Sequence, residues 1–186
     1  MYRELLRDAR FFELLLTIDE EKAEKVRTGR CPRCGGPLHA GHFERKPRGL
    51  QHTSGYQKRF DLCCGWCRKR TMPPSVRFLG RKVYAAAAVV IATAVARGSD
   101  RNAVQLVRQE LGASPSTLVR WRRWWRELVG SAFWVRARGQ LPVDLDAERL
   151  PASLLSQYMG SAGDRMLRLL RWMAPWGASP IPEHAG

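Results

Sequence analysis

The chain has 186 residues, of which 32 are lysine or arginine and 17 are aspartate or glutamate, so its formal net charge is +15. Hydrophobic residues make up 45% of the chain, which is enough for one or two small folded domains and excludes a disordered protein. The cationic excess predicts a polyanionic partner, nucleic acid before an anionic membrane. A merely solvated basic surface would explain the number of arginines but not their clustering.

The N-terminal segment is predicted to be helical. Leucine and phenylalanine recur near helical spacing over residues 2–27, with Ile18 as an alternative start of a second helical piece, and Gly29 ends the segment. Acidic residues are mixed into it, unlike the charged and then apolar regions of a secretion signal. The longest apolar run, residues 83–95, is too short to span a bilayer. We therefore expect a cytoplasmic protein with reduced thiols and no membrane partner, found on the nucleoid when it is bound to DNA.

Two C-x-x-C pairs are the strongest motif. They are Cys31 with Cys34 and Cys64 with Cys67. Two such turns bring four thiolates to one ion, which is the shell that structural zinc prefers, and the spacing is that of a zinc ribbon with two knuckles joined by strands. We expect one structural Zn²⁺ as the only cofactor.

The choice of ligands leaves alternatives open. Cys63 is the alternative to Cys64, which we prefer because it completes a C-x-x-C with Cys67. His39 and His42 could each replace a cysteine, but a histidine in a basic segment is more often a surface residue. A disulfide or a redox pair is disfavoured, since the sequence has neither a secretion signal nor a βαβ pattern.

Strands are predicted between the cysteine pairs. Residues 38–44 form one candidate, and the alternation over residues 56–62 forms another. Gly35 and Gly65 are expected to adopt positive φ, because the backbone folds tightly around a metal.

Positive side chains crowd the ribbon and the arm that follows it. Over residues 43–82 only Glu44 and Asp61 oppose Arg45, Lys46, Arg48, Lys58, Arg59, Arg68, Lys69, Arg70, Arg77, Arg81 and Lys82. Contact with a phosphate backbone explains this density better than a solvated loop does. The residues assigned to DNA phosphates are Arg45, Lys46, Arg48, Arg68, Lys69 and Arg70.

A helix-turn-helix is predicted in the second half of the chain. Helices are expected over residues 81–97, from a cap at Ser99 or Asp100 to residue 111, and over residues 115–129. The last one begins after a turn at residues 112–114, with Ser114 as its N-cap and proline at its first position. Two helices joined by a short glycine-containing turn, the second basic and well capped, are typical of this DNA-binding motif.

The helix over residues 115–129 has two distinct faces. Leu118, Trp121, Trp125, Leu128 and Val129 share one side and are expected in the core. The predicted DNA contacts are Ser116, Thr117, Arg120, Arg122, Arg123 and Arg126. Arg120 and Arg123 are the candidates for base edges, because arginine is the commonest reader of guanine. A plain helical bundle with a solvated basic face is the alternative.

The remaining chain is expected to form short helices over residues 151–158 and 163–173 and a loose tail. The predicted fold class is mainly α with a small β zinc ribbon, in four parts: 1–29, 30–75, 76–135 and 136–186. Asp144, Asp146 and Glu148 lie in one loop without the strands that would support a two-metal phosphoryl-transfer core. We therefore expect no catalytic residue and no enzyme.

Taken together, these motifs resemble uncharacterised bacterial proteins associated with mobile elements and transposases. The resemblance lies in residues 31–39, 45–49, 63–81, 111–125 and 150–155. It implies a zinc ribbon and a helix-turn-helix acting on duplex DNA, as an accessory or DNA-binding component of a transposase. An RNA-binding zinc protein and an adaptor that docks a recombinase remain the alternative functions.

Overall fold

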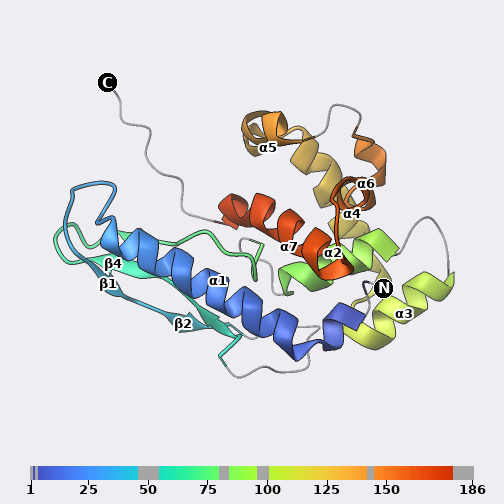
Figure 1. The fold of residues 1–186 in the computed structure, drawn as a ribbon, viewed down its shortest axis with the longest axis horizontal. Helices are drawn as coiled ribbons and strands as arrows, with labels where there is room; N and C mark the ends of the chain where they lie inside the picture. Colours follow the sequence, from blue (N-terminus) through green and yellow to red (C-terminus); the bar gives the residue numbers. More distant parts are fainter. Residues whose placement is uncertain are drawn as a thin grey trace.

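The computed structural model describes residues 2, 4–45, 55–79, 84–95, 101–141 and 145–177. The predicted fold class is confirmed, since the chain is mainly helical with two small antiparallel sheets (Figure 1). The α-helices are α1 (Ala9–Thr28), α2 (Ala86–Val95), α3 (Arg101–Leu111), α4 (Pro115–Val129), α5 (Ala132–Ala137), α6 (Ala152–Gln157) and α7 (Ala162–Met173). Short 3₁₀ helices are η1 (Glu4–Arg7), η2 (Arg138–Gln140), η3 (Ala147–Arg149) and η4 (Ala174–Gly177).

Helix α1 is one continuous element. Its N-cap is Asp8, whose carboxylate accepts hydrogen bonds from the backbone N–H groups of Arg10 and Phe11. It ends at Gly29, as predicted, and runs unbroken through Ile18, so the alternative second start there is wrong. The reason is packing, because Ile18 continues the buried side of the helix.

The strands are shorter than predicted. A sheet in the order β1 (Leu38–Ala40), β4 (Leu62–Cys64) and β5 (Arg70–Thr71) is accompanied by a pair of β2 (Phe43–Glu44) and β3 (Lys58–Arg59). Each predicted strand is therefore divided in two. At the division the imidazole of His42 contacts the backbone of Asp61, because its Nδ1 lies 3.0 Å from the carbonyl oxygen and 3.2 Å from the backbone nitrogen of that residue.

The core is built around α2. Residues 85–92 are at most 2% exposed and pack on all sides, which explains their continuous apolar run. Helices α3, α4, α6 and α7 contact α2, which lies in the middle of the helical part (Figure 1). A separate small cluster contains Cys31, Leu38, Leu62 and Cys64.

Helix α4 has the bounds that the sequence predicts. The Ser114 side chain accepts the backbone N–H of Thr117, and Pro115 occupies the first turn. Trp121 and Trp125 are buried as core residues, as expected. The indole N–H of Trp125 donates to Thr93 Oγ1 at 2.9 Å, which fastens α4 to α2 inside the core.

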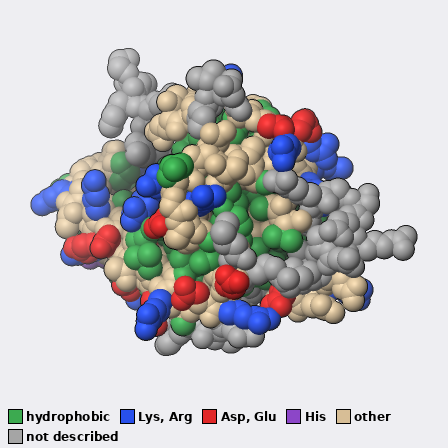
Figure 2. Space-filling model, turned by 45° about the vertical axis from the view of Figure 1, so that its right-hand side comes forward, with side chains coloured by type: hydrophobic (Ala, Val, Ile, Leu, Met, Phe, Trp, Pro, Cys, Tyr) green, Lys and Arg blue, Asp and Glu red, His purple; other side chains and the backbone are tan. Residues whose placement is uncertain are grey.

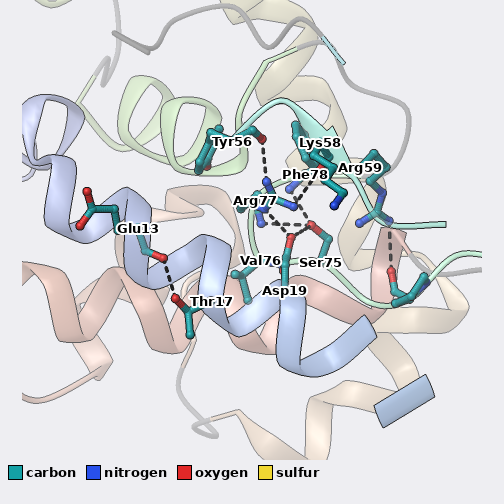
Figure 3. A network of polar contacts seen from close by, with 11 residues as sticks. Glu13, Thr17, Asp19, Tyr56, Lys58, Arg59, Ser75, Val76, Arg77 and Phe78 are labelled. Carbon is teal, nitrogen blue, oxygen red and sulfur yellow. Dashed lines mark hydrogen bonds and ion pairs between the residues drawn. The ribbon is translucent and has the colours of Figure 1, made fainter. Parts of the chain in front are cut away.

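A buried ion pair joins α1 to the ribbon and its arm (Figure 3). Arg77 donates to Asp19 Oδ2 at 2.8 Å and to the carbonyl oxygens of Tyr56 and Lys58 at 2.6 and 2.7 Å. Asp19 also accepts the hydroxyl of Ser75. The segment that contains Ser75 and Arg77 is therefore fixed against both α1 and β3.

Two cations counted toward the phosphate-binding surface are in fact buried. Arg77 is 0% and Arg59 is 2% exposed, so neither reaches a phosphate. Arg59 donates to the carbonyl of Pro73 at 3.1 Å, and burial lowers its pKa to about 10. The local charge density predicted them to be exposed phosphate contacts, because their buried partners lie far away in the sequence.

Candidate functional site

Each C-x-x-C pair forms a knuckle of the same backbone design. In the first, the N–H of Cys31 donates to the carbonyl of Gly36 and the N–H of Gly35 to the carbonyl of Cys31, both at 2.9 Å. In the second, Cys64 donates to the carbonyl of Lys69 at 3.0 Å and Arg68 donates to that of Cys64 at 3.1 Å. The repeated pattern turns both cysteines of each pair toward one point.

The four thiols of Cys31, Cys34, Cys64 and Cys67 converge. Their sulfur atoms all lie within 4.8 Å of one another. Sγ of Cys31 is 3.7 Å from that of Cys67, and Sγ of Cys34 is 3.5 Å from that of Cys64. A tetrahedral zinc–thiolate shell with bonds of about 2.3 Å places its sulfurs roughly 3.8 Å apart. The tetrad therefore could hold one metal ion.

The alternative ligands lie outside the tetrad. Cys63 alternates with Cys64 along β4, so its thiol points to the other face, toward the carbonyl of Arg68 at 3.7 Å. His42 packs its ring edge against Phe60 while its Nδ1 is occupied by the backbone. His39 lies on β1 opposite Cys63.

The glycines of the knuckles have two different roles. Gly35 has a φ of +71°, as predicted, but Gly65 does not have a positive φ. At Gly65 a Cβ atom would lie 2.9 Å from Nε2 of His39, so a larger residue there would require the exposed imidazole to move. In the second knuckle Arg68 takes the position equivalent to Gly35, with a φ of +58°.

The local environment favours a thiolate in the tetrad. Burial raises the pKa of Cys64, but the N–H groups of Cys67 and Trp66 and the thiol of Cys34 outweigh it and lower that pKa to about 6. For Cys34, the N–H of Gly36 lowers the pKa, whereas the neighbouring thiols and burial together raise it to about 11. The thiolate, the form that binds metals, is thus favoured at Cys64 near neutral pH.

The outer face of α4 is basic. Ser116, Arg120, Arg123 and Arg126 are exposed, and Val119 is 55% exposed among them. Arg122 is only partly exposed.

Thr117, predicted as a DNA contact, is 6% exposed. Its hydroxyl lies 3.0 Å from Oγ of Ser114 and accepts a hydrogen bond from Arg120 at 3.1 Å. That prediction is therefore corrected, because Thr117 supports the helix start and the position of Arg120 instead of reaching outward.

The predicted phosphate contacts of the ribbon differ in environment. Arg68 and Lys69 are exposed in the second knuckle. Arg70 pairs with the buried Asp61 at 2.9 Å but keeps 63% of its side chain exposed. Arg45 lies 5.6 Å from the ring centroid of Phe78, and burial lowers its pKa. The predicted contacts Lys46 and Arg48, together with Arg81 and Lys82, lie outside the described residues.

Charge is distributed unevenly over the surface. On the face drawn in Figure 2, acidic and basic side chains lie close together around hydrophobic ones, so that face is not uniformly basic in its described part.

No helix of the described residues is both long and apolar enough to cross a membrane.

Comparisons with known proteins give no assignment. No protein-family model matches the chain, and the searches of curated proteins and of solved structures found no match. The function is therefore inferred from the metal centre and the surfaces themselves.

Proposed function

We propose that this chain is a duplex-DNA-binding protein in which α4 enters the major groove and the cysteine tetrad holds one Zn²⁺. The exposed face of α4 is the observation that carries the proposal. It presents three arginines and the apolar side chain of Val119 from a helix whose opposite face is fixed in the core. Arginine suits guanine edges, and a small apolar group suits the thymine methyl.

The packing of α4 supports this assignment. The turn between α3 and α4 contains Gly112 with a φ of +59°, and Ser114 caps the second helix. Helix α2 packs against both α3 and α4. A helix-turn-helix likewise joins two helices by a short turn, and the N-terminal part of its second helix faces the bases.

The zinc ion would have a structural role. Four cysteines fill a tetrahedral shell, so no position remains for a reactive water, as a catalytic zinc requires. Binding would contribute on the order of 10 kcal/mol to folding of the ribbon. We accordingly propose a binding protein without enzymatic activity.

The biological setting is proposed from the motifs alone. The cysteine and arginine strings of residues 31–39 and 63–81 resemble those of transposase-associated bacterial proteins. We propose that the chain acts on DNA beside a transposase or recombinase, in the cytoplasm.

Two arginine variants test the interface. Arg120→Ala and Arg123→Ala are compared with Arg171→Ala, an exposed arginine of α7, by fluorescence anisotropy with labelled duplex DNA at two salt concentrations. Loss of a base-reading arginine should weaken binding to the preferred duplex by about 1–3 kcal/mol and binding to random duplex much less. Arg171→Ala should change neither.

Structured RNA in the same assay tests the main alternative. The proposal fails if RNA competes better than any duplex, or if the α4 variants bind the preferred duplex as tightly as the unaltered protein. Binding that depends wholly on an added recombinase would instead support the adaptor function.

A further inference from the structure

Trp66 is the most unusual side chain of the metal centre. It lies between the two cysteines of the second knuckle and is 67% exposed. Burying an indole gains a large apolar area, so an exposed one at a rigid position needs an explanation. The other large hydrophobic side chains exposed among the described residues lie on different elements, namely Leu14, Phe43, Val119, Val135 and Met159.

The indole of Trp66 is held in a defined position. A Cβ atom at Gly36 would lie 2.9 Å from Cγ and Cδ2 of Trp66 and equally close to Sγ of Cys64. The ring therefore packs over the bare backbone of Gly36 in the first knuckle. The backbone N–H of Trp66 donates to Sγ of Cys64 at 3.4 Å. The two knuckles thus present an aromatic surface whose orientation is fixed before any ligand arrives.

The charged residues of the two knuckles are all positive. Residues 30–43 and 62–79 contain no aspartate or glutamate. The exposed cations of the knuckles are Arg33, Arg68 and Lys69, and Arg30 is exposed directly before Cys31. A protein-docking patch is usually a contiguous apolar surface, whereas Trp66 is the one large hydrophobic side chain exposed in the two knuckles.

We propose that this knuckle face, made of Trp66, Arg33, Arg68 and Lys69, binds a single-stranded polynucleotide. An unpaired base would stack on Trp66 while the cations contact the adjacent phosphates, the combination that non-specific single-strand binding uses. Paired bases hide their faces inside a duplex, so this site differs from that of α4. In Figure 1, β1 and β4 lie at the end of the molecule opposite α3. The inference goes beyond the proposed duplex reading and does not depend on it.

The test uses oligo(dT) and oligo(rU) of roughly ten nucleotides, within the usual site size, and the full-length zinc-loaded protein. Trp66→Leu removes the aromatic surface but keeps an apolar side chain, and Trp66→Phe keeps a smaller ring. Val135→Ala, another exposed hydrophobic residue, is the matched control. Zinc content and circular dichroism establish that each variant is folded.

Trp66→Leu should bind the single strands roughly 5- to 150-fold more weakly, the range expected for one lost stacking contact. Trp66→Phe should fall between Trp66→Leu and the unaltered protein, and Val135→Ala should match the latter. Trp66→Leu should bind the preferred duplex within twofold of the unaltered protein. A failure of the proposed duplex binding by α4 would therefore be distinguishable from a failure of the single-strand site. A stronger effect on oligo(dT) or on oligo(rU) would identify the strand type.

Two results would overturn the inference. In one, Trp66→Leu binds both oligonucleotides within twofold of the unaltered protein. In the other, Trp66→Leu and Trp66→Phe are equally weak, which would show that the side chain matters only for packing on Gly36.

Discussion

Arg77→Met should destabilise the protein more than most single substitutions. The change keeps a side chain of similar length but removes three hydrogen bonds, those to Asp19, Tyr56 and Lys58. It also leaves the carboxylate of Asp19, which is 1% exposed, without its cation. Removing one partner of a buried pair costs about 3–5 kcal/mol. Folded domains are stable by only about 5–15 kcal/mol, so a large part of the total would be lost.

Urea unfolding followed by circular dichroism measures this loss directly. Arg77→Lys should also be markedly destabilised, because an ammonium group cannot reproduce the three directed bonds of the guanidinium. The control is Arg27→Met, which breaks only an exposed pair with Glu24 on α1 and should leave the midpoint almost unchanged. A loss below about 1 kcal/mol for Arg77→Met would contradict this prediction, since it would place that residue in the range of surface pairs.

Three further outcomes are expected. Cys64→Ser should abolish stoichiometric zinc binding, measured by atomic absorption, whereas Cys63→Ser should retain it; equal zinc loss in both would show that the tetrad is misassigned. Arg68→Gly should keep zinc and change the free energy of unfolding by less than about 1 kcal/mol, because relief from a φ of +58° offsets the entropy of glycine; a larger loss in urea unfolding would argue against this backbone. Thr93→Val should cost about 1–3 kcal/mol in the same experiment by leaving the indole N–H of Trp125 buried and unpaired, and no loss would contradict that bond.

Local patterns were enough to predict much of this fold. Proline and serine at the start of α4, and its tryptophan stripe, gave the correct bounds and the correct buried face. The C-x-x-C spacing identified the two cysteine pairs, whose sulfur atoms lie within 4.8 Å of one another in the structure. Each of these features depends on residues close together in the sequence.

Features that depend on distant partners could not be predicted in this way. Arg77 looked like one more exposed cation, since its partner Asp19 precedes it by 58 residues. The division of the strands depends on the contact between the side chain of His42 and the backbone of Asp61. The two knuckles have the same backbone hydrogen bonds. The sequence does not show this similarity, because residue 68 is arginine where the first knuckle has glycine.

We propose above all that this zinc-stabilised chain reads duplex DNA through α4. The most direct test is selection from a random duplex library by the full-length protein, with zinc quantified, at two salt concentrations. The proposal predicts one zinc per chain and one enriched motif that survives the higher salt, because base contacts depend less on counterion release than phosphate contacts do. Binding that vanishes with salt and enriches no sequence would contradict it.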